Sequence, residues 1–144
     1  MSFNIRQLEP ADYDDVIMLW ADAGLPFKPR GRDSRTQLTH EMKRDDSFFV
    51  GLFDEHRMIA VGFASFDGRR GWINRLAVHP DHRGRGLAAQ VIAECERFLK
   101  KRGAVVYAAL IEEVNSPSMS CFEKAGYVCL SEYKYFRKAD SEDA

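Results

Sequence analysis

The sequence is poor in the features that mark secreted, metal-stapled or membrane-spanning proteins. It contains only three cysteines in 144 residues, Cys95, Cys121 and Cys129, and none forms a C-x-x-C pair. An odd and widely spaced set predicts neither a disulfide framework nor a zinc site, and it suits a reducing compartment. No apolar run approaches the length that spans a bilayer, and the first residues do not resemble a signal peptide. We therefore expect a cytoplasmic protein that needs no metal and binds no membrane.

The sequence also has almost no excess of positive or negative charge. Lysine and arginine number 21 against 22 aspartates and glutamates, so the net charge is −1 and the isoelectric point is about 6.4. Proteins that bind nucleic acids normally carry a strong basic excess. The basic residues here gather only locally, at positions 28–35 and 83–85. We expect no nucleic-acid partner.

Apolar residues, in contrast, are plentiful enough for one domain with a proper core. They make up 45% of the chain, with 12% aromatics. Alternating and helical patterns predict a series of strands and helices with no repeat and no linker. The strands are expected at 3–8, 47–53, 58–66, 72–78, 104–111 and 126–136, and the helices from Pro10 and at 34–43, 87–102 and 115–124.

The stretch from Trp72 to Gly103 organises this series. A predicted strand ends at Val78, a turn with a proline follows, and Gly84 and Gly86 lie at the entry to a long amphipathic helix. A helix start presents unpaired backbone N–H groups at the positive end of the dipole, and glycines let an anion approach them. With the charges of Arg83 and Arg85, this loop predicts a pyrophosphate site.

Three nucleotide-type motifs compete for the loop. A P-loop requires Gly-Lys-Ser/Thr, which Gly86-Leu87-Ala88 does not provide. A dinucleotide fingerprint is matched by Gly84-x-Gly86-x-x-Ala89, but that motif turns from strand to helix with almost no spacer. The third pattern is Arg83-x-x-Gly86-x-Ala88 behind a strand that ends Leu76-Ala77-Val78-His79-Pro80. It resembles the acyl-CoA-binding signature of the GNAT superfamily of N-acetyltransferases.

A second segment strengthens that resemblance. GNAT enzymes commonly place an asparagine at the exit of the strand after the signature helix, and then a helix that closes as aromatic-Glu-Lys-x-Gly-aromatic. The chain supplies these residue types at Asn115, Phe122, Glu123, Lys124, Gly126 and Tyr127. The resemblance is close over residues 70–130 and extends to the rest by element order. It implies an α/β GNAT domain over 1–138, with a mixed antiparallel and parallel sheet whose central strands splay apart, and a polar tail at 139–144.

The resemblance also implies a set of cofactor-binding positions. It places the pyrophosphate in the loop and pairs the end of the strand with pantetheine. The residues are Leu76, Ala77, Val78, Arg83, Gly84, Arg85, Gly86, Leu87, Ala88 and Asn115.

The expected catalytic positions are less regular. Glu112 and Glu113, at a strand exit, are the candidates for deprotonating an amine. Many family members carry tyrosine where this chain has Phe122, and that phenol is taken to protonate the departing thiolate. Cys121 could carry an acyl group, but no base can be assigned to it. The pair His79 and His82 is interpreted as loop residues and not as metal ligands.

These expectations lead to one function with two alternatives. The resemblance implies direct transfer from acetyl-CoA to a primary amine of a small molecule or a peptide, and a homodimer is compatible with it. The loss of the tyrosine at Phe122 keeps open a CoA-binding sensor or partner module without transfer activity. An NAD-binding fragment is the third hypothesis.

Overall fold

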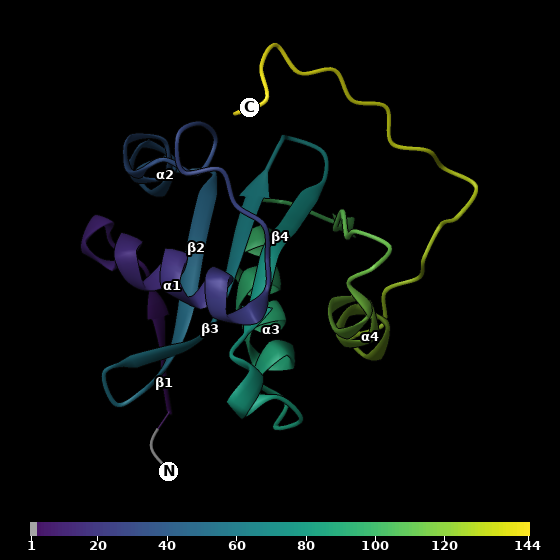
Figure 1. The fold of residues 1–144 in the computed structure, drawn as a ribbon. Helices are drawn as coiled ribbons and strands as arrows, with labels where there is room; N and C mark the ends of the chain where they lie inside the picture. Colours follow the sequence, from purple (N-terminus) through teal and green to yellow (C-terminus); the bar gives the residue numbers. More distant parts are fainter. Residues whose placement is uncertain (1–2) are drawn as a thin grey trace.

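The computed structural model describes residues 3–144 and has one five-stranded sheet (Figure 1). The strands follow chain order across the sheet: β1 (Phe3–Gln7), β2 (Ser47–Asp54), β3 (Arg57–Phe66), β4 (Gly71–Val78) and β5 (Tyr107–Ala108). The first four are antiparallel, and β5 is parallel to β4. The mixed sheet that was expected is therefore confirmed.

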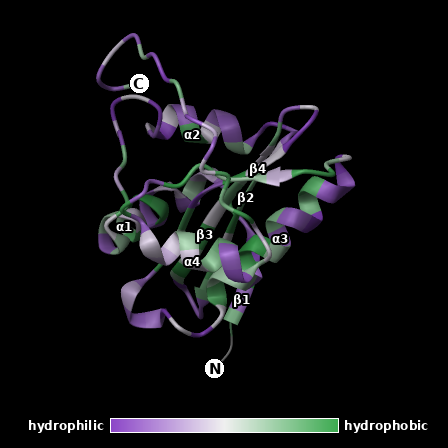
Figure 2. Ribbon diagram, turned by 90° about the vertical axis from the view of Figure 1, so that its right-hand side faces the viewer, coloured by the Kyte–Doolittle hydropathy of each residue, from purple (hydrophilic) through white to green (hydrophobic). Residues whose placement is uncertain are grey.

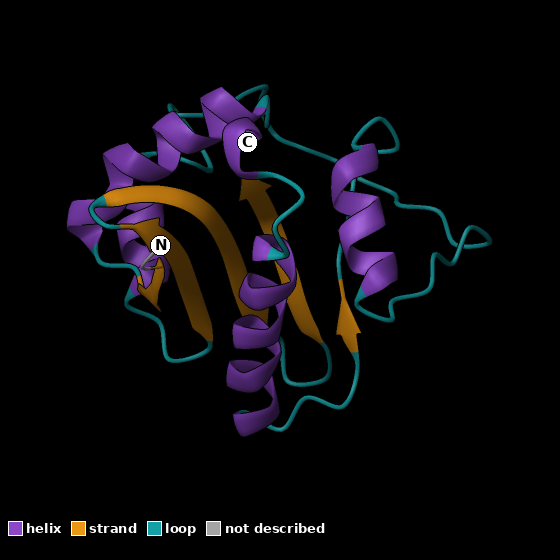
Figure 3. Ribbon diagram, turned by 90° about the horizontal axis from the view of Figure 1, so that it is seen from below, coloured by secondary structure: helices purple, strands orange, loops and turns teal. Residues whose placement is uncertain are grey.

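Four α-helices surround the sheet. They are α1 (Tyr13–Ala23), α2 (Arg35–Met42), α3 (Leu87–Lys101) and α4 (Ser116–Lys124), with short 3-10 helices at Pro10–Asp12 and Pro80–His82. Helices α1 and α2 cover one face and α3 the other, while α4 lies beyond β5 at the open edge (Figure 3). All four begin within a few residues of the predicted starts.

Each face of the sheet has its own core, because successive strand residues point to opposite faces. On β2, Val50 and Leu52 pack towards α3, whereas Phe49 and Phe53 pack towards α1 and α2. Hydrophobic residues concentrate in the central strands (Figure 2). Gly62 of β3 allows the close approach of α3, since a Cβ there would lie 2.6 Å from a methyl carbon of Val91.

Strand β4 contains a bulge before its end. Val61 pairs with Ala77 and Phe63 with Asn74, so that Arg75 and Leu76 together face Gly62. Arg75 has φ of 59°, in the left-handed region that side chains other than glycine rarely adopt. Beyond the bulge, the ladder with β3 resumes at Ala77 and Val78.

The expected strand at 104–111 is largely wrong. Only Gly71 and Trp72 pair with Tyr107 and Ala108, after which β4 and β5 separate. Further along, the side-chain oxygen of Asn74 accepts a hydrogen bond of 3.3 Å from the Leu110 N–H, in place of a backbone carbonyl. Because the two strands diverge, the remaining residues of the segment cannot continue the ladder, and the expected splay is present.

The expected strand at 126–136 is also wrong, since the segment forms no strand and runs away from the sheet as a loop (Figure 1). Its apolar side chains have no face to cover: Val128 and Phe136 are 78% and 91% exposed. The polar tail then returns to the loop between α1 and α2, where the Arg32 N–H donates to the Asp143 carbonyl. None of the described helices has the length and apolar character needed to cross a membrane.

Candidate active site

A cleft of about 360 Å³ opens where β4 ends, between the end of α1, the start of α3 and one side of α4. Its walls bring together nine of the ten positions expected to bind the cofactor, all except Arg85. The lining consists of Ala23, Leu25, Leu76, Ala77, Val78, His82, Arg83, Gly84, Gly86, Leu87, Ala88, Ala89, Asn115, Pro117, Ser118, Ser120, Cys121 and Lys124.

The start of α3 forms the floor of this cleft. Gly86 is its N-cap residue, with φ of 75° and ψ of 15°, and no side chain caps the helix. A Cβ added at Gly84 or Gly86 would meet no atom within 4 Å, so the space before the helix is open. Uncapped N–H groups at the positive end of the dipole fit a pyrophosphate. The residues present therefore fit a CoA-type ligand.

Arg83 and His82 add polar groups beside the helix start. The Nε of Arg83 lies 3.3 Å from the Val78 carbonyl, which holds the side chain along the wall of the cleft. His82 was interpreted as a loop residue, but it lines the cleft, and its Nδ1 is buried without a hydrogen-bond partner among the described residues. A buried polar atom of this kind is expected to have a partner when a ligand is bound.

Helix α4 supplies the opposite wall through one of its faces. Asn115 caps the helix by accepting a hydrogen bond of 3.3 Å from the Ser118 N–H. Pro117, Cys121 and Lys124 follow at spacings of four and three residues and line the cleft. That helical spacing was the signal that could have identified them from the sequence.

Phe122 lies elsewhere. It is only 4% exposed, belongs to the core on the α3 face, and packs edge to face with Tyr127 at 5.0 Å between ring centroids. The expectation that this ring faces the reacting thioester is wrong for this structure. The neighbouring position, Cys121, points to the cleft because one residue along a helix turns the side chain by about 100°.

Glu112 and Glu113 are exposed in the loop before α4 and do not line the cleft. The Glu112 carbonyl accepts a hydrogen bond of 2.9 Å from the Asn115 N–H, which ties this loop to the start of α4. Burial lowers the pKa of the Arg75 guanidinium, and the carboxylates of Asp33 and Glu112 oppose that shift. Glu112 therefore lies within electrostatic range of the bulge in β4.

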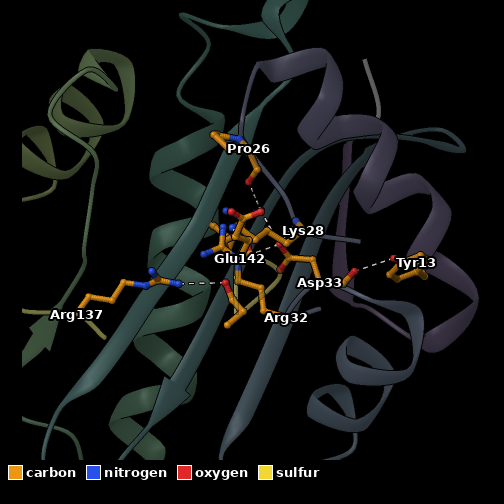
Figure 4. Close-up of polar contacts among 9 residues, drawn as sticks. Tyr13, Pro26, Lys28, Arg32, Asp33, Arg137 and Glu142 are labelled. Carbon is orange, nitrogen blue, oxygen red and sulfur yellow. Dashed lines mark hydrogen bonds and ion pairs between the residues drawn. The ribbon is translucent and has the colours of Figure 1, made fainter. Parts of the chain in front are cut away.

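Arg75 links the bulge to the loop between α1 and α2, whose residues Pro26 and Asp33 are labelled in Figure 4. Its guanidinium lies 4.1 Å above the Trp20 ring, donates to the Pro26 carbonyl at 2.7 Å, and approaches the Asp33 carboxylate at 3.6 Å. Asp33 is buried, and its carbonyl accepts the hydroxyl hydrogen bond of Tyr13 at 2.7 Å. These contacts fix the loop beside the end of β4. No spacing in the sequence predicts these contacts.

The comparison with protein families decides the assignment. The model of the acetyltransferase (GNAT) family matches residues 13–127. The chain belongs to this family. An acetyltransferase of Yersinia enterocolitica, YE1169, is 29% identical over 123 residues, which cover 85% of this chain and 86% of the relative. An N-acetyltransferase of Yersinia pestis described as uncharacterised is similar to the same extent.

Solved structures agree with the GNAT fold. The PaiA N-acetyltransferase of Thermoplasma acidophilum in complex with coenzyme A matches with a TM-score of 0.76 and 21% identity, over 86% of this chain and 88% of that one. The aminoglycoside acetyltransferase AAC(6')-Iy, in complex with a bisubstrate analogue, matches with a TM-score of 0.80 and 17% identity, over 96% and 99%. At these identities, the two structures show that this GNAT acetyltransferase shares their fold.

Proposed function

We propose that this GNAT protein transfers the acetyl group of acetyl-CoA directly to a primary amine of a small molecule or a peptide. The observation that carries the proposal is the uncapped start of α3, with Gly86 in the left-handed region and the cleft open before it. Family membership supports acetyl transfer, and similar structures contain coenzyme A or a bisubstrate analogue.

Different residues of the cleft would bind different parts of acetyl-CoA. The N–H groups of Leu87 and Ala88 and the guanidinium of Arg83 would hold the pyrophosphate by charge and hydrogen bonding. The bulged end of β4, Leu76 to Val78, offers backbone groups for the pantetheine arm. Such an arrangement accelerates transfer mainly by proximity and by stabilising charge on the carbonyl oxygen.

The chemistry requires one proton to leave the amine. The amine nitrogen attacks the acetyl carbon, the carbon–sulfur bond breaks, and the CoA sulfur leaves as a thiolate. Glu112, in the exposed loop before α4, is the proposed base, directly or through a water molecule, and Glu113 is the alternative. A thiol with a pKa near 8.5 is a tolerable leaving group, so no side-chain acid is required at position 122.

One observation favours a second candidate function, a CoA-binding module that transfers nothing. The described residues that line the cleft include no carboxylate and no tyrosine. A protein of this kind would bind CoA without a carboxylate or a phenol at the reacting atoms. The two candidates differ in whether CoA thiol is released in the presence of an amine.

The test separates binding from transfer. Acetyl-CoA at 100 times its dissociation constant should stabilise the protein by about 2.7 kcal/mol and raise its melting temperature, whereas NAD and ATP should do much less. Release of CoA thiol with a panel of amines then distinguishes the transferase from the binding module. Stabilisation by NAD and not by acetyl-CoA would overturn both candidates.

We also propose that the protein forms a homodimer in the cytoplasm. Support comes from the segment that follows α4, where apolar side chains are exposed: Val128, Leu130, Tyr133, Tyr135 and Phe136. Exposed apolar surface of this extent commonly marks an interaction surface.

A further inference from the structure

The loop between α1 and α2 is strongly basic, although the net charge of the chain is −1. Residues 28–35 contain four cations, Lys28, Arg30, Arg32 and Arg35, and a single acid, Asp33. The loop begins at the cleft, since Ala23 and Leu25 line it and the Pro26 carbonyl is bound to Arg75. A local positive field therefore lies next to the proposed site of transfer.

Two of these cations are neutralised within the folded body. The guanidinium of Arg35 lies 2.7 Å from the Asp14 carboxylate. Arg32 and Arg75 share the Asp33 carboxylate, at 3.1 Å and 3.6 Å. Asp33 is therefore fully engaged by the loop and by the bulge of β4.

The side chains of Lys28 and Arg30, in contrast, find their partners in the C-terminal segment. The Lys28 ammonium donates to the Glu142 carbonyl, and the Arg30 guanidinium lies 3.8 Å from the Asp143 carboxylate. Figure 4 shows Glu142 beside Lys28, on the same side of the sheet as Asp33. The segment 140–143 carries three acids in four residues, so its charge is complementary to that of the loop.

The backbone of the segment is bound as well. The Arg32 N–H donates to the Asp143 carbonyl at 3.3 Å. At Gly31 a Cβ would collide with that same carbonyl, so the loop presents a residue without a side chain where the peptide backbone passes. Contacts to carbonyl oxygens recognise a peptide backbone whatever its side chains, while the surrounding cations select for acids.

We propose that loop 28–35 is a docking surface for an acidic peptide, and that it delivers the amine of an acidic protein segment to the cleft. The chain's own residues 140–143 occupy this surface and compete with the acceptor. The inference rests on the proposed acetyl transfer and names its acceptor class. The cations of the loop repel a polycationic acceptor such as an aminoglycoside. In this respect the chain is expected to differ from the aminoglycoside acetyltransferases that have the same fold.

The test measures peptide binding to the whole 144-residue chain directly. The probe is a dye-labelled copy of residues 139–144, compared with a copy that has Asn and Gln in place of Asp and Glu, by fluorescence anisotropy at low salt. The tail variant Asp140→Asn/Glu142→Gln/Asp143→Asn should bind the acidic peptide about 3- to 10-fold more tightly than the unmodified chain, because its own tail competes less. Higher salt should weaken this binding.

Two further variants make the result specific. Lys28→Gln/Arg30→Gln in the tail variant should lose the preference for the acidic peptide, whereas Lys100→Gln/Lys101→Gln at the exposed end of α3 should keep it. Equal affinity for the acidic and amide peptides, or an unchanged preference in the loop variant, would overturn the inference.

A parallel assay separates this inference from the proposed function. Acetyl-CoA and each peptide, with its N-terminal amine free, are incubated with the tail variant, and released CoA thiol is measured. Transfer to both peptides at equal kcat/KM would leave the acetyltransferase standing and refute the docking surface. Loop-dependent binding of the acidic peptide without release of CoA thiol would refute the delivery of an acceptor by this surface, and release of CoA thiol with the panel of amines would still decide whether the protein transfers acetyl groups.

Discussion

Arg75 combines a strained backbone with a nearly buried charge. Its φ of 59° costs about 1–2 kcal/mol for a residue with a Cβ, and its Nε is buried without a hydrogen-bond partner among the described residues. The Trp20 ring, the Pro26 carbonyl and the Asp33 carboxylate compensate by holding the guanidinium. One side chain thus couples the bulge of β4 to the loop that borders the cleft.

This strain can be measured by comparing two substitutions at the same position. Both Arg75→Ala and Arg75→Gly remove the guanidinium contacts, but only glycine adopts a positive φ without a steric penalty. We expect the glycine variant to be more stable than the alanine variant by about 1 kcal/mol in urea unfolding, the reverse of the usual order within a strand. An alanine variant that equals or exceeds the glycine variant would contradict the bulge geometry.

At the scale of the elements, the start of α3 is the feature on which ligand binding depends. Gly86→Glu would place a carboxylate at the positive helix end, in the space proposed for the pyrophosphate. Gly68→Glu is a matched control, because Gly68 also has a positive φ, of 97°, and open space around it.

The two variants should lose comparable stability, since each forces a side chain into the left-handed region. Only Gly86→Glu should abolish the rise in melting temperature caused by acetyl-CoA, because Gly68 lies in the turn after β3. If both variants respond to acetyl-CoA equally, the phosphates bind somewhere other than the start of α3.

The elements that the sequence predicted well are those with strong local patterns. The apolar stripe of α3, the glycines at its entry and the helix predicted at 115–124 leave clear marks in a single sequence, and all are present. The segments 104–111 and 126–136 have strand-like composition, yet a strand also needs a neighbouring edge to pair with, and the ladder between β4 and β5 ends after two residue pairs. The orientation of Phe122 was missed because adjacent helical residues face different surroundings.

At the scale of the whole molecule, burial is unequal along the chain. The core residues come almost entirely from positions 8–104, whereas the large exposed apolar side chains are concentrated after position 104. A surface of this kind favours association between copies as the concentration rises.

We expect sedimentation velocity to show a concentration-dependent dimer. Tyr133→Ser/Phe136→Ser should shift the equilibrium towards monomer, because both side chains are largely exposed in the segment after α4. Met18→Ser is the control, since Met18 is an isolated exposed apolar residue on α1 at 64% exposure. A monomer at all concentrations, or an equal effect of the control, would contradict the proposed dimer.

The short ladder between β4 and β5 has a consequence for how the cleft opens. Only two residue pairs join β5 to the sheet, and α4 reaches the body largely through Phe122 and through the Tyr127 hydroxyl, which donates to Glu96 at 2.7 Å. Amides of β2 and β3 should therefore exchange with solvent only on global unfolding, while those of β5 and α4 exchange through a much smaller opening. The wall of the cleft that α4 forms can therefore move away from the start of α3 while the rest of the molecule stays folded. A ligand as long as acetyl-CoA can then enter the cleft from the side.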